Sequence, residues 1–189
     1  LKPVNMKSFN NFLDDRIKDF NNSAPVYLNI LKTVKEEFNR LLDNVTINET
    51  YFFREEKHFK YIKDVFIREK YGTRNTLNFW SASCSSGEEP LSLYTLLSRN
   101  LTTPFKIYAS DINTHVLNKF KNGIYRRSSL RTDGKPFLNL LDYIIESNDE
   151  NEIRISHEVI KKIDIREINL YTDPFSDLPK MDFIFLRNT

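Results

Sequence analysis

The sequence predicts an α/β fold in which a small helical unit precedes a parallel sheet. From residue 77 onward, short apolar runs alternate with amphipathic helical stretches, and this strand–helix order implies parallel strands joined by right-handed crossovers. Before residue 44, apolar side chains instead recur every three or four residues, which is the spacing of one helix face. We therefore predict a helical unit over residues 1–43 and an α/β domain over residues 44–189.

The composition limits the classes of function. The chain has 189 residues, of which 40% are hydrophobic, enough for one ordinary domain with a small module attached. A net charge of +2 does not indicate a general nucleic-acid surface, and no apolar run reaches the ~18 residues of a membrane-spanning helix. We expect no nucleic-acid partner, no insertion into a membrane and a monomeric state.

Cysteine and histidine usage gives no sign of a metal site. Cys84 is the single cysteine, so the chain has no internal disulfide and no all-cysteine metal site, as suits a reducing compartment such as the cytoplasm. Its three histidines are scattered without metal-ligand spacing.

The predicted elements follow from spacing and breaker residues. In the first half, one helical stripe runs from Met6 to Phe20, a second from Tyr27 to Leu41, and a third from Phe59 to Phe66 with Gly72 as its C-terminal cap. In the second half, we first predict two strand–helix pairs: a strand over Leu77–Ala82 with a helix over Glu89–Arg99 capped by Ser85 or Ser86, and a strand over Phe105–Ala109 with a helix around Val116–Phe120. After these we predict a short helix over Leu138–Ile145, an antiparallel ribbon over residues 152–168 and a buried strand over Met181–Leu186.

The segment Ser83–Pro90, which we call the cofactor turn, carries the first functional signal. It is small and rich in hydroxyls, and it joins a strand to a helix, so the backbone of the turn can approach a bound ligand closely. Glu88 and Glu89 stand where a dinucleotide-binding loop would present bare amides to a pyrophosphate. The turn, with Gly87 at its centre, therefore favours a nucleoside cofactor that carries hydroxyls and a positive charge but no phosphate, as S-adenosylmethionine (SAM) does.

Asp111 follows the next strand and has two possible roles. A carboxylate at this strand end can accept hydrogen bonds from both ribose hydroxyls, or it can cap the following helix. Its pairing with the Gly87 turn favours the ribose role. Glu88 and Glu89 fit the positive end of their helix, where one of them can also meet the ammonium or sulfonium group of SAM. We interpret Cys84 as a packing residue, since no histidine is placed to activate it.

Arg54 follows the aromatic run Tyr51–Phe53. A guanidinium beside aromatic rings can hold a carboxylate in a two-pronged grip. The alternative is a surface arginine whose aliphatic stem packs on the rings. The residues alone leave both interpretations open.

Six ordered segments resemble the bacterial chemotaxis receptor methyltransferases, the CheR family. The resemblance covers roughly residue 26 to the end and rests on Asn48–Arg54, Trp80–Pro90, Ala109–Ile112, Asn122–Arg126, Ile168–Leu170 and Asp182–Asn188. It implies a Rossmann-like SAM-dependent methyltransferase domain, with the ribbon over residues 152–168 as a small inserted β-subdomain. It also implies that glutamate side chains on the cytoplasmic helices of chemoreceptors are methylated by SAM, which becomes S-adenosylhomocysteine.

The resemblance implies roles for ten residues. Arg54 would orient the substrate glutamate as the catalytic residue, and the helical unit would dock on the receptor's methylation helices. Asn169 and Leu170 would flank the adenine, and Arg187 and Asn188 would lie near the methionine part. The full set expected at the cofactor is Asn48, Thr50, Arg54, Gly87, Glu89, Asp111, Asn169, Leu170, Arg187 and Asn188.

Two other functions stay open at this point: a SAM methyltransferase for a different substrate, and a SAM-binding sensor or docking module without turnover. The family continues past Arg187-Asn188, and this chain begins with Leu1 rather than Met, so we expect residues to be missing at both ends.

Overall fold

The computed structural model describes residues 6–45, 50–70, 75–131 and 135–187. The chain divides into two compact units, Leu1–Glu49 and Thr50–Thr189. The division falls a few residues after the boundary expected from the sequence.

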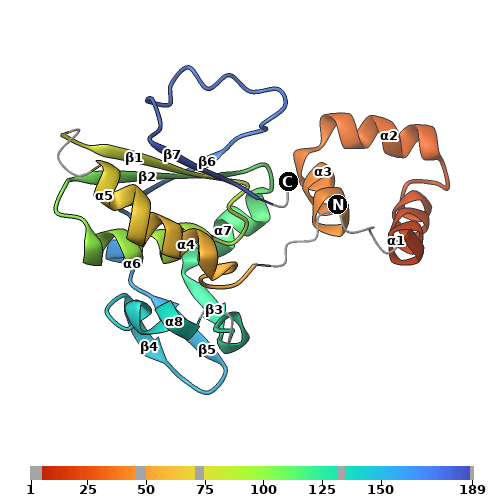
Figure 1. Ribbon diagram of the computed structural model, residues 1–189. Coiled ribbons are helices and arrows are strands. Elements are labelled where there is room, and N and C mark those ends of the chain that lie inside the picture. The colour runs from red at the N-terminus through yellow and green to blue at the C-terminus, as the bar shows by residue number, and fades with distance from the viewer. Residues whose placement is uncertain (1–5, 46–49, 71–74, 132–134, 188–189) are drawn as a thin grey trace. The chain divides into compact units, whose positions relative to one another are not determined.

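The first unit consists of three helices, coloured red to orange in Figure 1: α1 (Met6–Asp19), α2 (Ala24–Thr33) and α3 (Lys35–Val45). The prediction of one continuous helix from Tyr27 to Leu41 is wrong. Val34 adopts an extended conformation (φ −113°, ψ 102°) between α2 and α3. The hydroxyl of Thr33 bonds back to the carbonyl of Asn29 at 3.0 Å, as hydroxyls do when they compete with helical hydrogen bonds.

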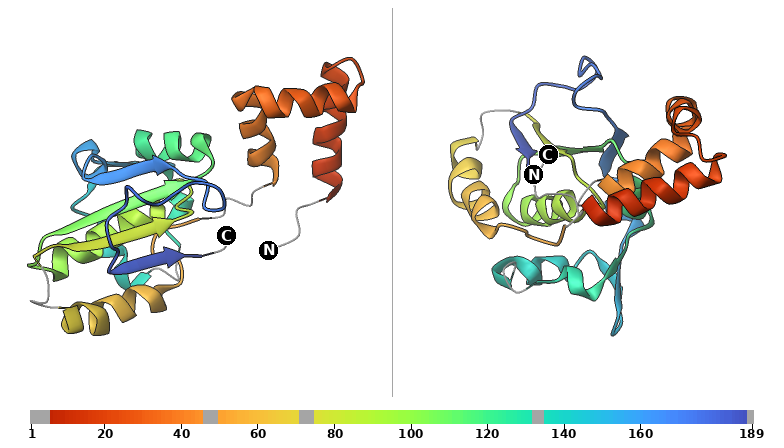
Figure 2. Two further views of the ribbon diagram at one scale, coloured as in Figure 1. Left: turned by 90° about the horizontal axis from the view of Figure 1, so that it is seen from above. Right: turned by 90° about the vertical axis from the view of Figure 1, so that its right-hand side faces the viewer.

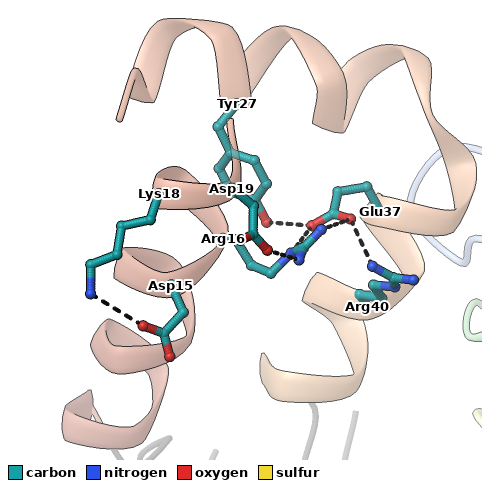
Figure 3. Close-up of polar contacts among 7 residues, drawn as sticks. All are labelled: Asp15, Arg16, Lys18, Asp19, Tyr27, Glu37 and Arg40. Carbon is teal, nitrogen blue, oxygen red and sulfur yellow. Dashed lines mark hydrogen bonds and ion pairs between the residues drawn. The ribbon is translucent and has the colours of Figure 1, made fainter. Parts of the chain in front are cut away.

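The break at Val34 brings α3 back against α1, where a buried carboxylate joins all three helices (Figure 3). Glu37 is 4% exposed. Its Oε1 and Oε2 accept hydrogen bonds from Nε and Nη2 of Arg16 at 2.7 and 2.8 Å, and Tyr27 donates to Oε1 at 3.2 Å. The Arg16 guanidinium outweighs the cost of burial and lowers the pKa of Glu37. The unit therefore centres on a charge-assisted hydrogen-bond network.

The second unit contains a four-stranded parallel sheet in the order β6-β2-β1-β7 (Figure 1). The strands are β1 (Leu77–Ala82), β2 (Phe105–Asp111), β6 (Ile163–Glu167) and β7 (Phe183–Leu186). Helix α6 (Glu88–Asn100) follows β1, and α7 (Thr114–Asn122) follows β2. The predicted α/β class is confirmed, because both βα units form and their strands pair in parallel from Leu77↔Phe105 to Ala82↔Ser110.

Opposite faces of this sheet have different coverings. One face is covered by α6 and by a helical stretch. That stretch consists of α4 (Glu56–Tyr61), a π-helical turn (Ile62–Phe66) and α5 (Ile67–Lys70). Together they bury an aromatic core, in which the ring centroids of Phe66 and Phe79 lie 5.6 Å apart. The predicted cap Gly72 lies outside the described residues. The segment between β6 and β7 lies over the opposite face, as the right-hand view of Figure 2 shows, and packs on a smaller cluster around Trp80 and Tyr108.

Strand β7 differs from its prediction. A buried strand was expected over Met181–Leu186, but Ile184 and Leu186 are 51% and 58% exposed and only Phe185 is buried. The alternating exposure arises because β7 has the core on one face only and pairs with β1 alone among the described strands.

A second, antiparallel sheet has the order β3-β5-β4. Its strands are β3 (Ile124–Arg126), β4 (Ile145–Asn148) and β5 (Glu152–Ile155). The predicted ribbon over residues 152–168 is therefore wrong in extent. After β5 the chain forms α9 (His157–Ile160), and β6 then joins the parallel sheet beside β2. Alternating apolar and polar residues indicate only that one face of a strand is buried. They do not distinguish an edge strand of a parallel sheet from an antiparallel ribbon.

The helix predicted over Leu138–Ile145 is also mostly wrong. α8 (Lys135–Leu138) and a 3-10 turn (Asn139–Leu141) end before Ile145, which begins β4 and pairs with Ile155. Pairing with β5 overrides the local helical spacing.

Candidate functional site

The cofactor turn has an unusual backbone. Ser83, Ser85 and Gly87 have positive φ values of 61°, 50° and 95°. Gly87 is the N-cap residue of α6, so the predicted capping by Ser85 or Ser86 is wrong. A Cβ at Gly87 would lie 2.2 Å from the Phe120 ring, which means that only glycine fits there.

Asp111 holds this turn from the neighbouring strand. Its Oδ2 accepts a hydrogen bond from the amide of Ser85 at 2.8 Å, and its Oδ1 accepts one from the amide of Asn113 at 3.0 Å. The capping role for Asp111 is wrong, because Asn113 caps α7 with its side chain.

The same atoms fit a ribose. An ionised carboxylate has about four acceptor positions, so two remain on Asp111 for the two donors of a ribose diol. The Ser85 hydroxyl, within the described part of the chain, is buried without a hydrogen-bond partner. An orphaned buried hydroxyl beside a carboxylate with spare acceptor capacity is what a nucleoside site needs before its ligand binds.

Glu89 lies at the start of α6 between two partners. Its Oε1 accepts a hydrogen bond from the Ser81 hydroxyl at 2.7 Å, and its Oε2 accepts one from Nε of Arg187 at 2.6 Å, with Nη2 of Arg187 also in contact. Nη1 of Arg187 donates to the backbone carbonyl of Arg54 at 2.7 Å. The structure thus brings Arg54, Glu89 and Arg187 together at the carboxyl end of β1 and β7.

Two further acidic groups in the turn have raised pKa values. Glu88 is 3% exposed, and burial raises the pKa of its carboxyl despite the hydrogen bond from the Ser86 hydroxyl at 2.8 Å. Burial, with help from the Asp111 and Glu89 carboxylates, raises the pKa of the Cys84 thiol well above its usual value. Because the thiolate is disfavoured and the side chain belongs to the main core, the packing interpretation of Cys84 is supported.

Arg54 lies on a segment anchored by aromatic residues. Phe52 and Phe53 are fully buried, and the amide of Phe53 donates to the Ser92 hydroxyl at 2.9 Å. The Arg54 guanidinium lies 5.7 Å from the centroid of the Tyr51 ring, and the guanidinium of Arg131 lies 4.4 Å from it. The Arg54 side chain therefore packs near an aromatic ring, as one of its two predicted interpretations expects, while its backbone carbonyl accepts the hydrogen bond from Arg187.

Asn169 and Leu170 come shortly after the end of β6, where Glu167 pairs with Asp111 and Ile168 follows. The amide of Ile168 donates to the Asp111 carbonyl at 3.1 Å, and Leu170 packs against the Trp80 cluster. Asn169 accepts a hydrogen bond from the amide of Tyr171 at 3.0 Å, which shapes the loop.

The remaining predicted residues are less informative. Thr50 is half-buried at the start of the second unit, and Asn48 and Asn188 lie outside the described residues. Among the residues that the structure describes, no group of three His, Cys, Asp or Glu side chains is arranged to hold a metal ion. None of the described helices is long and apolar enough to cross a membrane.

Residues 48–189 match the family model described as "CheR methyltransferase, SAM binding domain". The chain belongs to the CheR methyltransferase family. This confirms the resemblance seen in the sequence, and with it SAM as the cofactor of the matched domain.

Relatives of this CheR-family chain carry consistent names. The chain is 31% identical over 185 residues to the "Chemotaxis protein methyltransferase" of Borreliella burgdorferi, covering 92% of this chain and 64% of the relative. It is 33% identical over 169 residues to the protein of the same name in Escherichia coli, covering 86% and 57%. It is also 33% identical over 147 residues to "Chemotaxis protein methyltransferase 2" of Pseudomonas aeruginosa, covering 76% and 52%. The chain thus spans about half to two thirds of the length of these relatives.

Sequence reasoning missed three residues of the CheR-family site. Ser81 is a fully buried polar residue within an apolar strand, and that pattern was a usable signal. Phe120 lies under Gly87, and Tyr125 donates to the Ser86 carbonyl at 2.8 Å. Phe120 and Tyr125 each contact a residue more than thirty positions away in the sequence, so no local pattern marks them.

Proposed function

We propose that the protein containing this chain transfers the methyl group of SAM to glutamate side chains of chemoreceptors, forming methyl esters in chemotactic adaptation. The observation that carries this proposal is the match to the CheR SAM-binding domain over residues 48–189. The relatives named chemotaxis protein methyltransferase support the chemotactic role.

The cofactor side of the proposal assigns groups by their chemistry. SAM supplies an electrophilic methyl group on a sulfonium. Asp111 and the Ser85 hydroxyl bind the ribose, and Asn169 and Leu170 flank the adenine. Glu89 binds the methionine part, with Arg187 and Ser81 fixing its carboxylate. Gly87 lets the backbone of the turn approach the ligand, and Asn48, Thr50 and Asn188 complete the contacts.

The substrate side requires little acid–base chemistry. A glutamate carboxylate is already ionised at neutral pH and needs no base to become a nucleophile. Catalysis is then mainly the alignment of carboxylate and methyl group, which can contribute on the order of several kcal/mol, together with removal of water from the carboxylate. Arg54 orients that carboxylate, and the helical unit docks on the receptor's methylation helices.

The test is transfer of labelled methyl from SAM to chemoreceptor cytoplasmic fragments by the full-length protein. We expect label that is released by base, because carboxyl methyl esters hydrolyse there and N-methyl groups do not. Base-stable label on another molecule would indicate a different substrate. Binding of S-adenosylhomocysteine without any transfer would indicate a SAM-binding sensor.

The role of Arg54 has its own test. At a SAM concentration that saturates the variant, Arg54→Ala should lower methyl transfer roughly 10- to 100-fold through lost alignment of the substrate. Arg99→Ala is the matched control, since the Arg99 guanidinium lies 4.5 Å from the Tyr143 ring in a similar cation–π contact outside the site. Unchanged transfer by Arg54→Ala would exclude an orienting role.

A further inference from the structure

Tyr125 links the small antiparallel sheet to the cofactor turn. It lies in β3, is 4% exposed, and donates from its hydroxyl to the backbone carbonyl of Ser86 at 2.8 Å. Its ring meets the Phe52 ring edge to face, with centroids 5.2 Å apart. Because the ring is buried and its hydroxyl has a well-placed acceptor, this hydrogen bond fixes the Ser86 carbonyl relative to Tyr125.

The turn depends on such fixed contacts. Ser83 and Ser85 adopt left-handed conformations that residues other than glycine rarely occupy, and these persist only where the surroundings enforce them. The carbonyl of Ser110 accepts a hydrogen bond from the amide of Cys84 at 2.8 Å, and Asp111 accepts one from Ser85. Both of these supports come from β2.

The support from Tyr125 differs because it comes from the second sheet. It acts on Ser86, which lies between Ser85 and Gly87. Among the residues that the structure describes, the buried Ser85 hydroxyl has no hydrogen-bond partner, and Gly87 is the N-cap residue of α6. Both sheets therefore hold the part of the turn that we propose binds the nucleoside: the parallel sheet bonds to Ser85, and the antiparallel sheet bonds to Ser86.

We infer that Tyr125 is a positioning residue for the cofactor: its hydroxyl holds the Ser86 carbonyl and so keeps the turn in the conformation that binds SAM. It acts through the turn rather than as a catalytic group. The inference rests on the proposed function for the identity of the ligand.

The test compares two tyrosine variants of the full-length protein. Tyr125→Phe removes only the hydroxyl and keeps the ring on Phe52. Tyr94→Phe is the matched control, because Tyr94 is also buried, at 8% exposed, and its hydroxyl accepts a hydrogen bond from Lys162 at 3.2 Å, outside the turn. We expect calorimetry to show S-adenosylhomocysteine binding about fivefold to tenfold weaker for Tyr125→Phe, the loss typical of one hydrogen bond, and within about twofold of wild type for Tyr94→Phe.

A second readout separates positioning from general stability. Urea unfolding should show similar losses for both variants, while only Tyr125→Phe raises the KM for SAM, with kcat unchanged. Equal binding by Tyr125→Phe and wild type, or equal weakening in both variants, would overturn the inference. If wild type itself fails to bind S-adenosylhomocysteine, the cofactor assignment of the proposed function fails instead, so the two failures are distinguishable.

Discussion

Glu37 in the helical unit and Glu88 in the cofactor turn are both buried carboxylates, 4% and 3% exposed, yet their surroundings act on them in opposite directions. Glu37 receives a two-pronged hydrogen bond from Arg16, and its pKa is lowered. Burial dominates at Glu88, where the Ser86 hydroxyl is the hydrogen-bonding side chain, and the pKa is raised.

The difference shows two ways of fixing a local structure. In the helical unit, charge pairing joins helices that are separate in the sequence, and the carboxylate is essential to the packing. In the cofactor turn, left-handed backbone conformations, the Phe120 ring and backbone hydrogen bonds set the geometry, and acceptor capacity on Asp111 is left for a ligand. Substitutions that remove charge should therefore damage the first region, and substitutions that add volume should damage the second.

The largest expected effect is at Arg16. Arg16→Met keeps much of the side-chain length but leaves the Glu37 carboxylate buried without its main cation, which should destabilise the helical unit by about 3 kcal/mol. Amide hydrogen exchange over α1–α3 measures this loss. Lys18→Met is the control, because the Lys18–Asp15 pair at 3.4 Å is exposed (Figure 3) and should contribute no more than about 0.5 kcal/mol. Equal effects of the two substitutions would contradict the comparison.

Gly87→Ala should follow in size. A left-handed conformation costs an alanine about 1–2 kcal/mol, and the contact of its Cβ with the Phe120 ring adds overpacking, for a total of about 2–3 kcal/mol. Urea unfolding gives the stability, and calorimetry with S-adenosylhomocysteine should show binding weakened at least about tenfold. Gly123→Ala serves as a control outside the turn, since Gly123 also has positive φ and a tight Cβ position against Ile160. Comparable instability without weakened binding is expected there.

The smallest effect concerns pH and has opposite signs in the two regions. The unfolded carboxyl of a glutamate titrates near 4.5. Because the folded pKa of Glu37 is lower, its contribution to stability is complete above that pH and is lost as the pH falls. Because the folded pKa of Glu88 is higher, its ionisation removes stability as the pH rises through the folded pKa.

Exchange protection of α3 and α6 between pH 3.5 and 7 measures these slopes, with Glu37→Gln and Glu88→Gln as references. Glu37→Gln should abolish the acid sensitivity of the helical unit. Glu88→Gln should leave the stability unchanged or raise it slightly, because the cost of burying a charge is removed. A marked loss of stability in Glu88→Gln would show that the ionised carboxylate supports the turn.

The candidate site could be marked in the sequence because its signals are local. The strand–turn–helix order around Gly87, the acidic residue at the end of the next strand and the aromatic run before Arg54 all lie within short windows. The α/β class followed for the same reason, since alternating apolar runs and helical stretches leave few topologies. The CheR-family motifs then identified the cofactor.

The errors share a physical cause. Residues 163–167 alternate like a ribbon strand but pair with β2, and the helical spacing after Leu138 gives way to pairing with β5. In both cases the decision lies with a partner strand that local periodicity does not specify. The break at Val34 is similar, because its consequence is the burial of Glu37 against Arg16, 21 positions earlier.

The sequence by itself determined the class of fold and, through the family motifs, the cofactor of the domain, and it marked the turn and the charged residues of the candidate site, because hydrophobic spacing and residue chemistry are local properties. Only the tertiary structure decided which strands form which sheet, that Asn113 rather than Asp111 caps α7, and that Tyr125 and Phe120 hold the turn. These depend on contacts between residues far apart in the chain, whose free energy is realised only when the sheets and helices pack.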